Sequence, residues 1–190
     1  EGLSPWMQKL PGGLIHVNVV GCALFAAISG SSAATVATVG KMSIPELRKR
    51  KYPEKILLGS LAGSGTLGLL IPPSIILIIY GVTTQESIAK LFIAGILPGI
   101  MMALIFMSYV IIWSLINKKE MPISYENFSF LEKIKKSKQL LPVIILILAV
   151  IGSIYTGVAT ATEAASLGVV GALIVSYFQN TLSLDTFKKS

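Results

Sequence analysis

Two short runs of small and helix-breaking residues interrupt stretches that are otherwise apolar enough to lie in a membrane. The first run, residues 30–35, reads Gly-Ser-Ser-Ala-Ala-Thr, and the second, residues 68–74, reads Gly-Leu-Leu-Ile-Pro-Pro-Ser. Irregular backbone survives in lipid only where it is buried in protein or lines a cavity. Helix ends beside such a break direct unpaired amides and carbonyls at whatever fills the cavity. The two runs therefore favour a solute-handling protein over a simple membrane anchor.

The stretches around these runs are poor in charge. The chain has 190 residues, of which 53% are hydrophobic and 13% charged, whereas soluble domains are about 25% charged. Segments 56–81, 91–116 and 140–158 contain no acidic or basic residue. At about 1.5 Å per residue, each is long enough, or nearly so, to cross a hydrocarbon core of roughly 30 Å. The predicted fold class is an all-α polytopic membrane protein.

The basic residues gather between the apolar segments. The two main groups are Lys41, Arg48, Lys49, Arg50, Lys51 and Lys55, and then Lys118, Lys119, Lys133, Lys135, Lys136 and Lys138. Two crossings separate the groups, so both lie on one face, and two further crossings return Lys188 and Lys189 to it. The positive-inside rule makes this face cytoplasmic. Topology therefore accounts for the net charge of +7, and no nucleic-acid partner is expected.

Residues 14–40 form the first apolar region and contain the first break. Residues 1–13 before them are amphiphilic and are expected to form an interfacial connector. The apolar parts on the two sides of the break are each too short for a full crossing. Two half-length helices around a flexible tip predict a re-entrant hairpin, with Lys9 and Lys41 on the same side of the membrane. The alternative is a single tilted span across 14–40.

The next region, residues 56–116, is expected to hold two membrane spans. Residues 41–55 before it form a charged cytoplasmic connector. Pro72-Pro73 falls inside the first span, where proline removes a backbone donor and pushes the preceding residue out of helical geometry. This span is therefore predicted to be discontinuous. Two glycine pairs are spaced so that a neighbouring helix can approach closely. They are Gly59 with Gly63 and Gly95 with Gly99.

The rest of the chain predicts a loop and two more spans. Residues 117–139 are polar and basic and are assigned to a cytoplasmic loop with a short surface helix. Residues 140–190 are assigned to two membrane spans and a cytoplasmic tail. The last span is expected at 163–178, after a turn that includes Thr160, with Thr162 as its N-cap and Glu163 in its first turn. Glu163 is also the one acidic residue bracketed by apolar segments, so a functional role at the membrane boundary is the other interpretation.

The motifs that would suggest an enzyme fail on their context. Residues 63–68, Gly-Ser-Gly-Thr-Leu-Gly, match a dinucleotide-binding glycine pattern, but they lie inside a membrane span without the preceding strand. The serines around residue 30 lack the arrangement of a nucleophile elbow. One histidine, His16, and one cysteine, Cys22, cannot build a usual zinc site, so no transition metal is expected. No enzymatic activity is predicted.

The small hydroxyl residues of the first break suit an ion and anion site better. Serine hydroxyls and freed carbonyls can coordinate Na⁺, a hard cation that prefers oxygen ligands. Amides at the start of a half-helix can hold a carboxylate. Close helix packing by small residues is the alternative interpretation, and it accounts well for Ala33 and Ala34.

Four motifs resemble those of a known transporter family and occur in the same order as in that family. Residues 25–34 (Phe-Ala-Ala-Ile-Ser-Gly-Ser-Ser-Ala-Ala) resemble the first re-entrant hairpin of the large membrane subunit of tripartite ATP-independent periplasmic (TRAP) transporters. Residues 70–74 (Leu-Ile-Pro-Pro-Ser), with Tyr80-Gly81, resemble the broken helix of that subunit. Residues 91–99 and 160–165 are similar to its following segments, although Ala161 stands where family members often have proline.

The resemblance implies an elevator-type secondary transporter of the bacterial inner membrane, with Na⁺ as coupling ion and no other cofactor. A periplasmic substrate-binding protein would deliver the substrate. A small membrane subunit, separate or fused, would brace the scaffold. The substrate would be an organic acid such as a C4-dicarboxylate, sialic acid or another sugar acid.

The resemblance also assigns roles to residues of both breaks, through backbone carbonyls as much as side chains. The Na⁺ candidates are Ser29, Gly30, Ser31, Ser32, Gly68, Ile71, Pro72 and Ser74. The candidates for the substrate site are Ser32, Ala33, Thr35, Pro73 and Ser74.

The large subunit of this family has a second, inverted half, and nothing in the sequence duplicates the first half. We therefore expect the chain to be a central fragment of the permease that holds half of the substrate site. Two other functions are compatible with the residues. One is a related ion-coupled anion transporter or channel without a binding protein, and the other is a non-transporting membrane scaffold.

Overall fold

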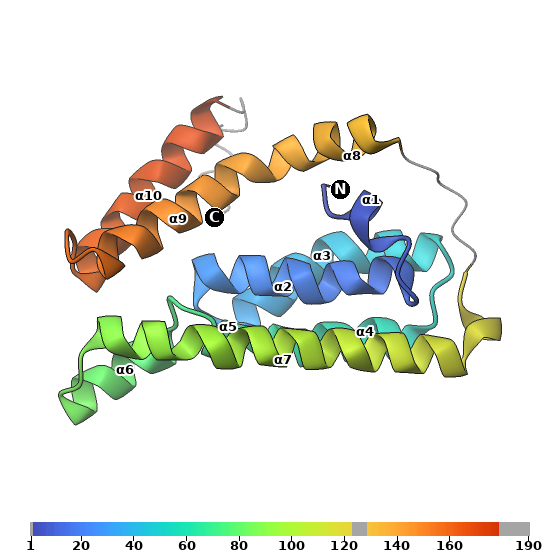
Figure 1. The fold of residues 1–190 in the computed structure, drawn as a ribbon, viewed down its shortest axis with the longest axis horizontal. Coiled ribbons are helices and arrows are strands. Elements are labelled where there is room, and N and C mark those ends of the chain that lie inside the picture. The colour runs from blue at the N-terminus through green and yellow to red at the C-terminus, as the bar shows by residue number, and fades with distance from the viewer. Residues whose placement is uncertain (1, 123–128, 179–190) are drawn as a thin grey trace. The chain divides into compact units, whose positions relative to one another are not determined.

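The computed structural model describes residues 2–122 and 129–178, and every regular element in these residues is a helix (Figure 1). The prediction of an all-α chain is confirmed for them. The chain divides into two units, Glu1–Gln139 and Leu140–Ser190, which are described separately. The expected cytoplasmic tail beyond residue 178, with Lys188 and Lys189, lies outside the described residues, as does part of the loop 117–139.

The first unit is a bundle of helices of very different lengths. Its elements are α1 (Ser4–Met7), η1 (Gly13–Ile15), α2 (His16–Ser29), α3 (Ser32–Lys49), α4 (Glu54–Gly65), α5 (Leu67–Leu70), α6 (Ile75–Thr84), α7 (Ile88–Ile116), η2 (Lys118–Glu120) and α8 (Phe130–Ser137). Helices α2 and α3 pack side by side, and α4 and α7 run along them (Figure 1). A 3-10 turn, η3 (Lys138–Leu140), lies at the boundary between the units.

Helices α2 and α3 form a helical hairpin, so residues 14–40 do not form the one continuous helix that a single tilted span would need. A Cβ atom placed on Gly21 of α2 would lie 3.6 Å from the Val39 side chain of α3. Helix α3 is also longer than the half-length helix expected there, because it continues through Pro45 to Lys49. Leu47 is buried among core side chains, and this packing holds the last turns of α3 in place.

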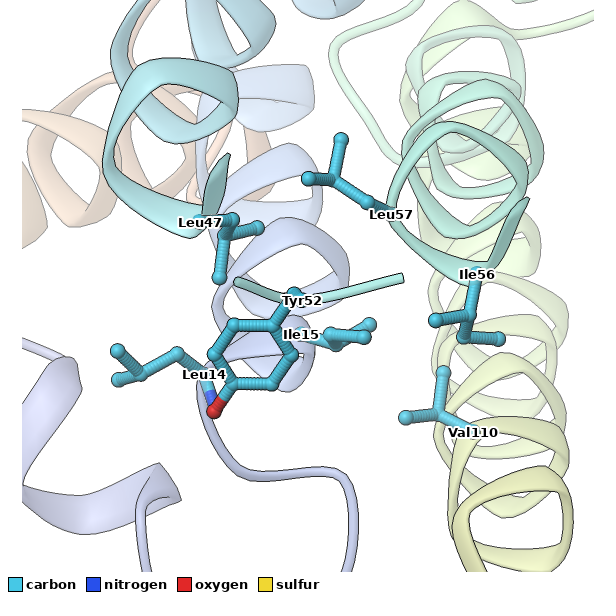
Figure 2. Close-up of a cluster of buried hydrophobic side chains, with 7 residues drawn as sticks. All are labelled: Leu14, Ile15, Leu47, Tyr52, Ile56, Leu57 and Val110. Atoms are coloured by element: carbon cyan, nitrogen blue, oxygen red, sulfur yellow. The ribbon is translucent and has the colours of Figure 1, made fainter. Parts of the chain in front are cut away.

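The largest buried cluster lies at the end of the bundle opposite the hairpin tip. Its members are Leu14, Ile15, Leu47, Tyr52, Ile56, Leu57 and Val110 (Figure 2). The Tyr52 hydroxyl accepts a hydrogen bond from the Leu14 amide at 3.0 Å. One aromatic side chain therefore ties the α3–α4 connection to the start of α2, through apolar contact and through a buried polar pair.

Two helical stretches in the described residues are long and apolar enough to cross a membrane. They are Glu54–Thr84 and Ile88–Ile116, and shorter apolar helices span Gly13–Ser29, Leu141–Tyr155 and Ala161–Tyr177. The first stretch is interrupted after Leu70, where residues 71–74 leave helical geometry, whereas α7 continues straight through Pro98. Large apolar side chains remain exposed along α7, as lipid contact requires.

The second unit is a pair of packed helices, α9 (Leu141–Tyr155) and α10 (Ala161–Phe178). Small residues of α10 permit the contact. A Cβ atom on Gly168 would lie 3.4 Å from the Val150 side chain, and one on Gly171 would collide with Leu146. The α9–α10 pair therefore depends on missing side-chain volume, as membrane helix pairs commonly do.

The N-cap of α10 is Thr160, so the assignment of this cap to Thr162 is wrong. The Glu163 carboxylate accepts hydrogen bonds from both the amide and the hydroxyl of Thr160, each at 2.8 Å. In return the Thr160 hydroxyl accepts from the Glu163 amide at 3.3 Å. This reciprocal pair is a capping box, in which the acidic residue lies three positions after the N-cap residue. Glu163 lies three positions after Thr160 but only one after Thr162. The geometry supports the helix-start interpretation of Glu163.

Candidate functional site

The tip of the α2–α3 hairpin is a turn made by Gly30 and Ser31. Gly30 has a φ of 59°, a left-handed conformation that glycine adopts without steric cost, and its amide donates to the Ala26 carbonyl at 3.0 Å. Ser31 is extended, and its hydroxyl oxygen accepts from the Ala34 amide at 3.4 Å. The first residue ends α2 and the second caps α3, so the chain reverses within two residues.

Hydroxyl and carbonyl oxygens gather inside this tip. Thr35 is fully buried, and its hydroxyl donates to the Ser31 carbonyl at 2.7 Å. The Ser29 hydroxyl lies 3.0 Å from the Thr35 hydroxyl and 3.3 Å from the same carbonyl. Three oxygen atoms therefore lie within hydrogen-bond distance of one another, which is the kind of ligand set that a hard cation accepts.

The second break follows from two consecutive missing donors. In a continuous helix the Gly68 and Leu69 carbonyls would accept from the amides of residues 72 and 73, but both residues are prolines. Ile71 and Ser74 are extended, and the buried Ser74 donates its hydroxyl to the Leu69 carbonyl at 2.6 Å. Ser74 thus satisfies one of the freed carbonyls, and α6 begins at the next residue.

The two breaks meet in the folded chain, although about 40 residues separate them. A Cβ atom on Gly30 would lie 2.7 Å from the Pro73 carbonyl oxygen. A Cβ atom on Gly68 would lie 2.8 Å from the Ser31 carbonyl carbon and oxygen and from the Ser32 amide nitrogen. The Ile75 amide also donates to the Gly30 carbonyl at 3.4 Å. Backbone therefore lies against backbone at this point, and only glycine permits so close an approach.

Helix α7 supports the second break from the other side. A Cβ atom on Gly95 would lie 3.0 Å from the Leu70 carbonyl oxygen, and one on Gly99 would lie 2.9 Å from the Ile71 side chain. The prediction that this glycine pair permits close packing is confirmed. For the pair in α4 the prediction holds only for Gly63, where a Cβ atom would lie 3.3 Å from the Phe106 side chain. It is wrong for Gly59, where a Cβ atom would meet nothing within 4 Å.

Most of the expected site residues lie at this contact or beside it. They are Ser29, Gly30, Ser31, Ser32, Thr35, Gly68, Ile71, Pro72, Pro73 and Ser74. Ala33 is exposed on α3. Thr160, Thr162 and Glu163 belong to the second unit. Among the described residues, no group of three or more histidine, cysteine or acidic residues could hold a metal ion.

Sequence reasoning missed one buried polar contact between the hairpin and α4. Asn18 is fully buried, and its amide nitrogen donates to the Ser60 hydroxyl at 3.0 Å and to the Leu57 carbonyl at 3.2 Å. Its carbonyl oxygen has no hydrogen-bond partner among the described residues. The signal was visible, because Asn18 is the one amide side chain in the apolar residues 14–29. A pair of this kind fixes how α2 sits against α4.

Comparison with known proteins gives the class of protein to which this geometry belongs. Residues 7–190 match the family described as tripartite ATP-independent periplasmic transporter, DctM component. The chain belongs to this family, which consists of membrane permease components of transporters and not of enzymes.

Several curated relatives support the same membership. The chain is 40% identical over 88% of its length to the C4-dicarboxylate TRAP transporter large permease protein DctM of Pseudomonas aeruginosa. It is 38% identical over 95% of its length to the isethionate TRAP transporter permease protein DctMQ of Oleidesulfovibrio alaskensis, and 36% identical over 94% to the sialic acid TRAP transporter large permease protein SiaM of Vibrio cholerae. The chain spans 38%, 28% and 41% of these relatives, respectively.

Proposed function

We propose that this chain forms part of the large permease subunit of a TRAP transporter that takes up an organic acid with Na⁺ across the bacterial inner membrane. A C4-dicarboxylate or a sugar acid is the substrate class, in line with the names of two of the relatives. A periplasmic binding protein delivers it, and a small membrane subunit, fused or separate, completes the assembly. The observation that carries the proposal is the contact between the two helix breaks.

The helix ends at this contact favour a cation and an anion side by side. Helices α2 and α5 end there, at Ser29 and Leu70, and their carboxyl ends carry partial negative charge. Helices α3 and α6 begin there, at Ser32 and Ile75, and their amino ends carry partial positive charge. Oxygens of Ser29, Ser31, Thr35 and Gly68 would coordinate Na⁺, while the amino ends of α3 and α6 would hold the carboxylate.

Coupling follows from the same arrangement. The contact is made mostly of backbone atoms from two separate breaks, so a bound Na⁺ that holds the breaks together also positions both helix amino ends for the anion. Each ligand then raises the affinity for the other, as thermodynamic linkage requires. The hairpin is re-entrant in this proposal, and it moves with the broken helix as one rigid element of an elevator.

The test is uptake by the complete permease, reconstituted in proteoliposomes with its binding protein and small subunit. A panel of carboxylates is offered with and without an inward Na⁺ gradient. Uptake that needs both the gradient and the binding protein supports the proposal. Uptake without the binding protein would instead indicate the related ion-coupled transporter, and no uptake of any acid under a Na⁺ gradient would contradict transport by this mechanism.

The site itself is tested by Ser31→Ala and Ser32→Ala. We expect a higher Na⁺ concentration for half-maximal uptake, by up to about tenfold, because each variant removes a hydroxyl at the hairpin tip, and the Ser31 hydroxyl caps α3 and so positions the Ser31 carbonyl that would coordinate Na⁺. Ser87→Ala is the matched control, because Ser87 caps α7 through a 3.4 Å bond from the Lys90 amide, as Ser31 caps α3, but lies outside the contact. Unchanged Na⁺ activation in both site variants would refute the assignment.

A further inference from the structure

A cavity lies at the end of the first unit opposite the helix breaks. Its volume is about 340 Å³, and it is formed by the loop before η1, the Tyr52 side chain and the segment from the end of α7 to Pro122. Helix α2, 14 residues long, separates this loop from the hairpin tip by about 20 Å. The cavity is therefore distinct from the candidate Na⁺ and substrate site.

Three hydrogen-bond donors with no acceptor among the described residues line this cavity. Ser114 is 4% exposed, and its hydroxyl has no hydrogen-bond partner. The Tyr52 hydroxyl accepts from the Leu14 amide, which leaves its own hydrogen free to be donated. The Lys118 ammonium forms no ion pair among the described residues. A buried hydroxyl without a partner is costly, so this set, with the Gln8 amide group in the same lining, favours an occupant that offers acceptor oxygens.

The charge of the cavity selects an anion. Within residues 2–122 and 129–178, no acidic residue lines it. The amino end of the η1–α2 segment and the carboxyl end of α7 both border it, so their opposite partial charges offset each other. The sign of the site is then decided by Lys118. Among anions, a phosphate group matches two hydroxyl donors and an ammonium well, since it offers several strong acceptor oxygens.

Much of the rest of the lining is apolar, and this indicates which kind of molecule carries the phosphate. Leu10 and Leu115 line the cavity and are both exposed, at 36% and 47%. Ile112, one turn back along α7 from Leu115, is 57% exposed, so an apolar surface leads from the cavity into the membrane-spanning part of this helix. A small hydrophilic anion would gain nothing from this surface, whereas an acyl chain would.

We propose that this cavity binds the phosphate headgroup of an anionic glycerophospholipid, with its acyl chains lying against Leu115 and Ile112. Lys118, Ser114 and Tyr52 hold the phosphate oxygens. The positive-inside rule places this end of α7, with Lys118 and Lys119, in the cytoplasmic leaflet, where anionic lipids meet basic pockets between helices. The bound lipid anchors the start of the hairpin to the end of α7.

The test uses the complete permease purified in nonionic detergent, with dioleoyl phosphatidylglycerol as the probe. Binding is titrated by native mass spectrometry, and folding of each variant is checked by size-exclusion chromatography. We expect Lys118→Gln to weaken lipid affinity by about tenfold, and Ser114→Ala to weaken it by a smaller factor. Lys119→Gln is the matched control, because Lys119 neighbours Lys118 in η2 but does not line the cavity.

Three outcomes decide the proposal. Weaker binding in the two cavity variants and unchanged binding in the Lys119 variant supports it. Equal lipid affinity in the wild type and in all variants would overturn it. If Lys118→Gln misfolds, the affinity of Ser114→Ala can still be compared with that of the wild type, because this variant only removes a hydroxyl. Displacement of the lipid by inorganic phosphate at equal concentration would also overturn it, because the site would then be one for a free anion. None of these outcomes bears on Na⁺-coupled uptake.

Discussion

At the scale of single residues, the contact between the breaks depends on two glycines and on buried hydroxyls. Gly30 and Gly68 each face backbone atoms at a distance that a Cβ atom cannot occupy. Thr35 is fully buried and directs its hydroxyl at the carbonyl of the hairpin tip. Each helix break has a local cause, but these residues allow the two breaks to contact each other. Substitutions here test the pairing itself.

Gly68→Ala should push the two breaks apart. The added methyl group would meet the backbone of Ser31 and Ser32 at 2.8 Å, and backbone cannot rotate away as a flexible side chain can. We expect a loss of about 1–3 kcal/mol in stability, seen as a lower thermal unfolding midpoint in detergent, together with a large loss of uptake.

The control for Gly68→Ala is Gly59→Ala. Gly59 is also inside a helix of the same membrane-spanning stretch, but a Cβ atom there would meet nothing within 4 Å. We expect an unchanged or slightly higher unfolding midpoint, because alanine favours the helix. Similar losses in both variants would mean that the close approach of the breaks is not the cause.

Thr35→Val should weaken the oxygen cluster without changing the volume of the side chain much. The variant removes the hydroxyl that donates to the Ser31 carbonyl and faces Ser29, at a cost of about 1 kcal/mol. Thr66→Val is the control, since the Thr66 hydroxyl also donates to a carbonyl at 2.7 Å but is exposed. If Na⁺ activation of uptake shifts equally in both variants, the Thr35 hydroxyl has no special part in ion binding.

At the scale of helices, each break has a local cause and a distant partner. Pro72 and Pro73 stop α5 because they lack amide donors, and Gly30 stops α2 in a left-handed conformation. Helix α7 then packs its small residues Gly95 and Gly99 against the second break. The broken helix consists of the short elements α5 and α6, with 4 and 10 residues, whereas α7, which supports it, is a continuous helix of 29 residues.

The start of α10 gives a test of one element alone. Thr160→Ala removes the capping box with Glu163, and we expect a loss of about 0.5–2 kcal/mol in the stability of that helix end. Thr162→Ala should have little effect, because Thr162 lies inside the helix. Amide hydrogen exchange in the first turn of α10 measures the difference. Faster exchange in the Thr162 variant than in the Thr160 variant would restore Thr162 as the cap.

At the scale of the whole molecule, the membrane topology of the hairpin decides whether its tip lies inside the membrane. The hairpin of α2 and α3 brings its two outer ends together, and the basic residues on either side of the membrane spans agree with one cytoplasmic face. A hairpin that enters and leaves on the same face puts its tip inside the membrane, where the broken helix can meet it.

Single cysteines at Lys9 and Lys41 test this topology in a Cys22→Ala background. Both lysines are exposed, and a re-entrant hairpin places both on the cytoplasmic side. A membrane-impermeant maleimide should therefore label Lys9→Cys and Lys41→Cys in inside-out vesicles and neither in intact cells. Glu86→Cys, in the loop after α6, is the control and should be labelled from the outside. Labelling of the two hairpin positions from opposite sides would exclude re-entry.

Much of the fold could be predicted from the sequence because its causes are local. Missing donors at Pro72 and Pro73, and the flexible Gly30, locate the breaks without knowledge of any neighbour. Other features were predicted wrongly because their causes are not local. Leu47 extends α3 to Lys49 through distant packing, and Gly59 resembles Gly63 in sequence but faces no helix.

The sequence by itself determined that this chain is a helical membrane protein and where its two helix breaks lie, since charge, apolar length, glycine and proline act within a few residues. Only the tertiary structure decided that the two helix breaks face each other. That contact joins residues about 40 positions apart through backbone atoms, and Ser31 and Pro73 contribute only main-chain atoms to it. No periodicity or composition encodes such a pairing, because it depends on how α2, α4 and α7 pack together.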